Sequence, residues 1–150
     1  MIDANRAGAV LTVDLNALAE NYTFLKGQLS MNTSCAAVVK SDAYGLGLEP
    51  IAVRLADEGC NSFFVAFMDE AISLRAILKR HNKAAKIYLL NGVAEGSESD
   101  LDNYDITPVL NSLAEIERWS AHAKQSGKRD AILNLDTGMS RLGLDTRELD

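Results

Sequence analysis

Short apolar runs recur along the chain, and each is followed by a stretch in which apolar residues repeat at helical spacing. The runs predict five buried strands, at residues 36–39, 63–67, 87–90, 106–110 and 131–135. Runs that are apolar on both faces are typical of parallel sheets. Strands that alternate with helices predict crossover units, so we expect an α/β fold built on a parallel sheet.

The helical stretches carry start and stop signals. Asp14 and Asn16 are candidate N-terminal caps for a helix that runs to about residue 29. Pro50 lies in the first turn of the next helix, which Gly59 ends. The remaining helices are predicted from about residue 69, more weakly at residues 95–103, and at residues 113–125.

Two strand predictions are less regular than the others. Residues 10–13 are predicted to form a short strand ahead of the first helix. Pro108 lies inside the run at residues 106–110, where it removes a backbone donor that a central strand normally uses. No linker or low-complexity segment interrupts the series, so we interpret residues 1–150 as one α/β unit.

The composition is that of an ordinary globular chain with an acidic balance. Of its 150 residues, 47% are hydrophobic and 24% are charged, and the net charge of −6 argues against a nucleic-acid surface. No apolar run approaches the roughly 20 residues of a membrane span, and the N-terminal apolar stretch is too short for a signal peptide. Cys35 and Cys60 lack metal-ligand spacing and are interpreted as buried thiols. We therefore expect a cytoplasmic protein without nucleic-acid or membrane partners.

Lys40 directly follows the strand predicted at residues 36–39. Ligands in α/β folds bind at the carboxyl ends of strands, so this lysine lies where chemistry is expected. A solvated lysine that closes a strand is the ordinary alternative. The turn that follows contains Tyr44, Gly45 and Gly47, and the glycines allow the backbone to bend sharply or to approach a ligand closely.

A second motif follows the strand predicted at residues 131–135. Residues 136–143 read Asp-Thr-Gly-Met-Ser-Arg-Leu-Gly. Asp-Thr-Gly after an apolar run suggests an aspartic protease, but that chemistry needs two carboxylates that share a proton. It also needs an all-β fold, which the predicted helices contradict. A tight turn with Gly138 at positive φ and Arg141 on the surface is the simpler structural interpretation.

Together, the two motifs resemble those of the alanine racemase family. Val-Val-Lys-Ser-Asp-Ala-Tyr-Gly-Leu-Gly at residues 38–47 is similar to the family's pyridoxal-phosphate lysine motif, and residues 136–143 are similar to its Asp-Thr-Gly-Met-x-Arg-x-Gly motif. The resemblance runs over essentially the whole chain, which is less than half of a typical family member. It implies the N-terminal portion of a (β/α)8 TIM-type barrel, incomplete in this chain, with a C-terminal β domain expected in the full protein.

The resemblance also implies roles for three residues. Lys40 would hold pyridoxal 5'-phosphate as a Schiff base and move the Cα proton of the substrate on one face. Tyr44 would donate a hydrogen bond to the cofactor phosphate, although a tyrosine that merely covers the strand end is an alternative. Arg141 would reach the phenolic oxygen of the cofactor and hold the substrate carboxylate. The implied reaction interconverts L-alanine and D-alanine, and its D-alanine would supply cell-wall peptidoglycan.

One position departs from the family pattern. Two residues before the aspartate of the second motif, many members carry a lysine that becomes carbamylated and contacts the arginine. Asn134 occupies that place here and cannot be carbamylated. Because a buried guanidinium needs a negative partner, we expect a small anion such as chloride between Asn134 and Arg141.

Several alternatives stay open. The protein could be a non-catalytic pyridoxal-phosphate-binding or homeostasis protein, a racemase for another amino acid, or a decarboxylase on the same kind of barrel. Arg141 favours an enzyme, because a carrier needs no clamp for a substrate carboxylate. Racemisation also needs a second base on the opposite face, for which this chain has no evident candidate. In the family that base is a tyrosine from the C-terminal domain of the other subunit, so we expect a homodimer.

The alternative fold is an open doubly wound sheet, which usually carries a glycine-rich phosphate loop after its first strand. Neither G-x-G-x-x-G nor the Walker A pattern occurs in the chain. Five strand–helix units cannot close an eight-stranded barrel. A helix signal at Asp145 or Thr146 also stops within one turn, at Asp150. We therefore interpret residues 1–150 as a partial barrel domain, and we expect residues 1–30 to pack toward the C-terminal domain.

Overall fold

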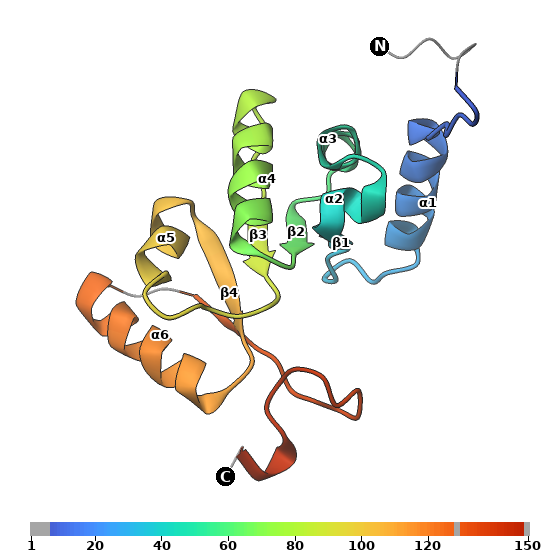
Figure 1. The fold of residues 1–150 in the computed structure, drawn as a ribbon. Coiled ribbons are helices and arrows are strands. Elements are labelled where there is room, and N and C mark those ends of the chain that lie inside the picture. Colours follow the sequence, from blue (N-terminus) through green and yellow to red (C-terminus); the bar gives the residue numbers. More distant parts are fainter. Residues whose placement is uncertain (1–6, 128–129, 149–150) are drawn as a thin grey trace.

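Five strands form one parallel sheet within residues 7–127 and 130–148, which are the residues that this computed structural model describes. The strands are β1 (Ala37–Val38), β2 (Ser62–Val65), β3 (Lys86–Leu89), β4 (Ile106–Leu110) and β5 (Ile132–Leu133). Each strand pairs in parallel with the one before it, in the order β1-β2-β3-β4-β5 (Figure 1). A doubly wound sheet reverses its order at a switch point, whereas a (β/α)8 barrel does not. The sheet is therefore the N-terminal portion of a barrel.

Helices connect successive strands and cover one face of the sheet (Figure 1). They are α1 (Leu15–Gly27), α2 (Lys40–Gly45), α3 (Leu48–Asp57), α4 (Met68–Arg80), α5 (Glu98–Asn103) and α6 (Leu113–Ser126), and a 3-10 turn follows at Thr146–Glu148. The predicted cap of the first helix is confirmed, because the carboxylate of Asp14 accepts hydrogen bonds from the backbone N–H groups of Asn16 and Ala17 at 2.8 and 3.2 Å. The strand at 106–110 is also confirmed, with Pro108 inside it.

The two faces of the sheet differ in burial. On the helix-covered face the core holds fully buried side chains, among them Phe63, Val65, Ile87, Leu74 and Leu78. On the opposite face Phe64 and Tyr88 stack with ring centroids 4.7 Å apart, and Val38 is exposed. The interior of a small barrel is filled by side chains from all of its strands. This second face therefore corresponds to the interior face of a barrel.

The strand predicted at residues 10–13 is wrong. This segment has no regular structure, and Val10 and Leu11 are exposed. A strand needs a neighbour for its backbone N–H and C=O groups, and no strand in the described part of the chain lies beside this segment. Four strands also end earlier than predicted: β1 at Val38, β2 at Val65, β3 at Leu89 and β5 at Leu133. Lys40 therefore begins α2 instead of ending a strand, and the terminal helix signal gives only the 3-10 turn. Asp150 lies outside the described residues.

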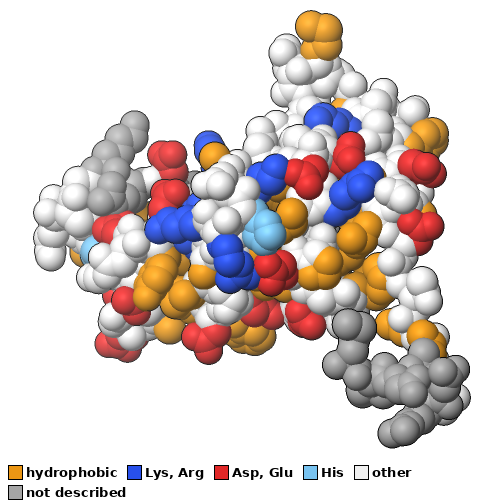
Figure 2. Space-filling view, turned by 90° about the horizontal axis from the view of Figure 1, so that it is seen from above, with side chains coloured by type: hydrophobic (Ala, Val, Ile, Leu, Met, Phe, Trp, Pro, Cys, Tyr) orange, Lys and Arg blue, Asp and Glu red, His pale blue; other side chains and the backbone are white. Residues whose placement is uncertain are grey.

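Positive and negative side chains intermingle on the face shown in Figure 2. Ion pairs of this kind join the ends of α3 and α4, where Arg80 and His81 each contact Glu49 at 2.7 Å. Such a mixture differs from the continuous basic stripe that a nucleic-acid surface needs. Within the described residues, no helix has the length and apolar character to cross a membrane.

Candidate active site

A cavity of about 800 Å³ lies at the carboxyl ends of the strands. It is lined from the ends of β1, β2, β3 and β5, by Lys40, Ser41, Ala66, Phe67, Leu90 and Asn91 and by seven residues between Asn134 and Leu142. This is the edge where barrel proteins bind their ligands. The fold thus brings Lys40 and Arg141, which are far apart in the sequence, to the wall of one cavity.

Lys40 precedes a turn whose backbone is left-handed. The next four residues, 41–44, are not glycine, yet all have φ between 52° and 57° and form one turn of left-handed helix. That conformation costs about 1–2 kcal/mol per non-glycine residue, and such strain concentrates at functional sites. Gly45 and Gly47 follow, also at positive φ, and lead into α3.

Three contacts hold this left-handed turn. Ala43 is buried in the core. The carboxylate of Asp42 accepts a 2.6 Å hydrogen bond from the backbone N–H of Leu48 and so caps α3. The backbone N–H of Ser41 donates to the carboxylate of Glu70, at 2.7 Å. The turn is therefore fixed by elements on both sides of it.

Glu70 lies in the first turn of α4 and binds three backbone N–H groups. Its Oε1 accepts from Ser41, and its Oε2 accepts from Ala66 at 2.8 Å and from Phe67 at 3.1 Å. Hydrogen bonds to an ionised carboxylate are shorter and stronger than neutral ones. One carboxylate thereby ties the turn after β1 to the turn after β2.

Arg141 lies on a loop that folds back onto the end of β5. The backbone N–H of Leu144 donates to the carbonyl of Asn134, and the N–H of Asp136 donates to the carbonyl of Leu144, each at 2.8 Å. Gly143 makes this closure possible: its φ is 105°, and a Cβ there would lie 2.9 Å from the nitrogen of Asp136 and 3.0 Å from the oxygen of Asn134. The Arg141 side chain is exposed and has no hydrogen-bond or ion-pair partner within residues 7–127 and 130–148.

The same loop is held from within by Asp136. Its Oδ1 accepts from the backbone N–H groups of Ser140 at 3.0 Å and Gly138 at 2.9 Å. These donors, Ser140 first, hold the pKa of the Asp136 carboxyl below its usual range. The positive φ predicted for Gly138 is confirmed at 127°. The loop that carries Arg141 is therefore closed at both ends.

Asn134 is hydrogen-bonded to Asn111, which directly follows β4. Its Nδ2 donates to Oδ1 of Asn111 at 2.8 Å, and the buried Asn111 amide donates to the carbonyls of Leu90 and Val109, both at 3.0 Å. One N–H of the Asn134 amide is therefore already used, and the other stays available at the cavity wall that Asn134 shares with Arg141.

Comparison with known proteins places the chain in a family. The family profile described as "Alanine racemase, N-terminal domain" matches residues 13–150. The chain belongs to the alanine racemase family.

Individual relatives agree with that assignment. The catabolic alanine racemase of Agrobacterium fabrum is 47% identical over 148 residues, which cover 98% of this chain and 37% of that protein. The alanine racemase of Brucella ovis is 46% identical over 145 residues, covering 96% and 36%. The crystal structure of the Bartonella henselae alanine racemase with covalently bound pyridoxal phosphate matches with a TM-score of 0.82 and 40% identity, over 91% of this chain and 39% of that one. The chain thus spans less than two fifths of the length of these alanine racemases.

The sequence motifs of the alanine racemase family identified Lys40 and Arg141 but missed Glu70 and Asn111. Glu70 has the signature of a first-turn helix residue, and nothing local indicates that it reaches Ser41. Asn111 follows a buried strand, as Lys40 does, and that position was the one available signal. Tyr44 lies on the left-handed turn, but its side chain is 64% exposed and does not line the cavity. Its role at the phosphate stays a prediction.

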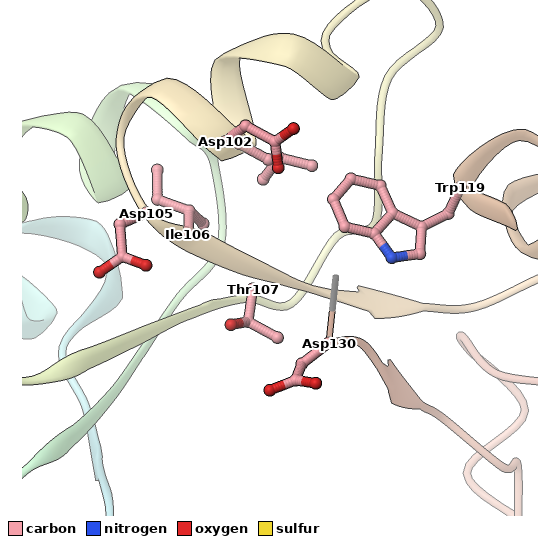
Figure 3. A pocket seen from close by; sticks show the side chains of 7 residues that line it. Asp102, Asp105, Ile106, Thr107, Trp119 and Asp130 are labelled. Atoms are coloured by element: carbon pink, nitrogen blue, oxygen red, sulfur yellow. The ribbon is translucent and has the colours of Figure 1, made fainter. Parts of the chain in front are cut away.

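A second cavity, of about 410 Å³, lies at the other end of β4 (Figure 3). Its walls include Asp102, Asp105 and Asp130, but two of these carboxylates have basic partners: Asp102 accepts from His122 at 2.8 Å, and Asp105 accepts from Arg75 at 3.1 Å. Within the described residues no group of three or more His, Cys, Asp or Glu side chains could hold a metal ion. We assign this cavity no part in the candidate active site.

Proposed function

We propose that the whole protein to which this chain belongs is an alanine racemase that uses pyridoxal 5'-phosphate bound by Lys40. The observation that carries the proposal is that Lys40 and Arg141, one from each family motif, line one cavity of about 800 Å³ at the carboxyl edge of the sheet. Cavities of about 300–1,000 Å³ hold small-molecule ligands and cofactors. The Bartonella henselae relative carries pyridoxal phosphate covalently.

The residues present fit this cofactor. Lys40 offers a primary amine that can condense with the cofactor aldehyde, and its side chain is only partly exposed at the cavity wall. Arg141 offers a planar guanidinium, which matches a carboxylate or a phenolate oxygen better than a lysine does. When bound, pyridoxal phosphate supplies the electron sink that makes the Cα proton of an amino acid removable.

The chain's own residues divide the remaining work. Lys40 would bind the cofactor covalently through Nζ, and the same amine would take or return the Cα proton of the substrate on one face. Arg141 would bind the substrate carboxylate and the phenolic oxygen, and Tyr44 would donate to the phosphate. The opposite face needs a second base, because one base alone tends to return the proton to the same side. We propose that a tyrosine from the C-terminal domain of the other subunit of a homodimer supplies it.

The wider setting follows from the same proposal. The racemase would act in the cytoplasm and supply D-alanine for peptidoglycan. We further propose that the full protein has a C-terminal β domain toward which residues 1–30 pack. α1 already packs against α3, and the apolar side chains of Val10 and Leu11 ahead of it are exposed, which supports a partner for this segment. Residues 1–6 lie outside the described part of the chain.

Borohydride reduction of the full-length protein with pyridoxal phosphate, followed by peptide mapping, tests the cofactor site. We expect one pyridoxyl adduct, on Lys40, and none in a Lys40→Ala variant. An adduct on another lysine would refute the assignment. A coupled assay for D-alanine formed from L-alanine, run beside other L-amino acids, then separates an alanine racemase from a non-catalytic homeostasis protein and from a racemase of another specificity.

A further inference from the structure

Two helices that follow strands carry a glutamate in the same position of their first turn. Glu115 in α6 accepts a 2.6 Å hydrogen bond from the backbone N–H of Asn111, and Glu70 in α4 accepts from Phe67 and Ala66. All three bonds satisfy backbone donors at the start of a helix, where a carboxylate is favoured. To this extent the two residues do the same work within their own strand–helix turns.

The carboxylate of Glu115 packs against Gly92 in the neighbouring turn, whereas Glu70 makes a hydrogen bond there: its second carboxylate oxygen accepts from the N–H of Ser41. Among the described groups, this carboxylate is the partner of that N–H. Ser41 is the first of the four left-handed residues, and it directly follows Lys40. The bond therefore acts where the backbone enters the left-handed turn, next to the candidate cofactor lysine.

A left-handed turn of four non-glycine residues has to be imposed by its surroundings, because the chain prefers the right-handed form. The buried Ala43 and the cap by Asp42 hold the far end of the turn. Glu70 holds the near end. Without its bond, the Ser41 peptide could rotate, and the direction in which Lys40 leaves the backbone would rotate with it.

We propose that Glu70 is a positioning residue for Lys40: it bridges the turns after β1 and β2, and it thereby fixes the left-handed turn that aims the lysine amine into the cavity. The inference rests on the proposed role of Lys40 as the cofactor lysine. It adds a residue from a second strand–helix unit to the machinery that sets the lysine's direction.

The test uses the full-length protein with Glu70→Asp and, as matched control, Glu115→Asp. An aspartate can still cap the first turn of its helix, but it is one methylene too short to span to Ser41. We expect Glu70→Asp to raise the dissociation constant for pyridoxal phosphate about ten- to a hundredfold, the worth of one charge-assisted hydrogen bond. We also expect it to shift the pH at which the absorbance of the bound cofactor changes, since that absorbance reports the surroundings of the lysine amine. Glu115→Asp is expected to change neither readout.

A rescue variant separates fixing the turn from general stabilisation. Glycine adopts positive φ without a Cβ clash, so adding Ser41→Gly to Glu70→Asp is expected to restore part of the lost affinity. If Glu70→Asp does not accumulate as folded protein, Glu70→Gln replaces it, because it keeps the length of the side chain and removes the charge.

The outcomes distinguish the two proposals. If the wild-type adduct maps to Lys40 and Glu70→Asp behaves like Glu115→Asp in both readouts, the positioning role is wrong and the cofactor site stands. If the wild-type adduct maps to another lysine, the proposed function fails and the inference fails with it. A selective loss in Glu70→Asp, restored in part by Ser41→Gly, supports the positioning role.

Discussion

The side-chain amide of Asn134 donates a 2.8 Å hydrogen bond to Oδ1 of Asn111, and this bond joins the end of β5 to the end of β4. Asn111 is buried, and its own amide binds two backbone carbonyls, so a single side chain links three consecutive strand ends. The Arg141 loop begins at Asn134. Its position therefore depends on a residue outside both family motifs.

Asn111→Ala is expected to destabilise the full-length protein by about 2–4 kcal/mol, because it removes three hydrogen bonds and leaves buried polar groups unpaired. Urea unfolding measures the change. Asn91→Ala is the matched control, since Asn91 is an exposed asparagine at the end of β3, and its change is expected within about 0.5 kcal/mol. Equal effects of the two substitutions would contradict the linking role of Asn111.

Gly143→Ala is expected to displace the Arg141 loop. A Cβ at this position meets backbone atoms at 2.9 and 3.0 Å, and backbone cannot move aside as a side-chain tip can. If the full-length protein is the proposed racemase, we expect its KM for alanine to rise about tenfold or more, as for the loss of roughly 1–3 kcal/mol of loop stability. Gly138→Ala is the control: it also lies at positive φ, but a Cβ there has no atom within 4 Å. A larger rise in KM from Gly138→Ala would show that φ strain, and not the clash, decides the effect.

A small anion is predicted between Asn134 and Arg141. The burial of Arg141 that first suggested this anion is wrong, because the side chain is exposed. The prediction now rests on the available donors: within the described residues one N–H of the Asn134 amide and the Arg141 guanidinium have no acceptor, so both can donate to an anion such as chloride. Crystals of the full-length protein grown in bromide would reveal the ion by anomalous scattering. Water or a neighbouring carboxylate at that place, together with activity that ignores halide concentration, would refute the prediction.

Tyr22 gives a prediction at alkaline pH. Its buried phenol donates to the carbonyl of Cys35 at 3.0 Å, and burial first, then the Cys60 thiol, raises its pKa well above the usual value. The folded state therefore keeps the phenol neutral where the unfolded state ionises. The stability that the neutral phenol contributes is complete below about pH 10, the ordinary tyrosine pKa, and is lost as pH rises toward the folded-state pKa.

The variant that isolates this effect is Tyr22→Phe. At pH 7 it is expected to be about 1 kcal/mol less stable than the wild type, through the lost hydrogen bond, and the gap should narrow above about pH 10. Urea unfolding between pH 7 and 11 measures both, with the more exposed Tyr104→Phe as the control. A gap that stays constant across this range would show that Tyr22 ionises equally in both states.

The hydrophobic pattern along the chain predicted an element correctly where the apolar run is buried in the structure. The strand at Ile106–Leu110 was predicted with the limits that the structure shows. Its apolar run is buried, although Pro108 lacks the backbone N–H that a strand residue normally donates to its neighbour. The run at 10–13 is equally apolar, yet no neighbouring strand pairs with it.

The sequence indicated two residues that line the candidate site, but not the contacts that hold them in place. Lys40 and Arg141 follow strands within recognisable motifs, so sequence sufficed to find them. The left-handed turn was missed. A sharp backbone turn was expected only at Gly45 and Gly47, and residues 41–44 contain no glycine that would indicate positive φ. The bond from Ser41 to Glu70 joins two units of the chain, and no local propensity encodes such a contact.

Each strand of the sheet pairs with the strand that immediately precedes it in the chain. Each pairing from β1 to β5 closes only one strand–helix unit of chain, so the entropy lost at each of these steps is small. Such a sheet can grow from β1 to β5 as the polypeptide leaves the ribosome, with each new unit docking on the edge left by the last. The order in which the strands are synthesised is thus also an order in which they can fold.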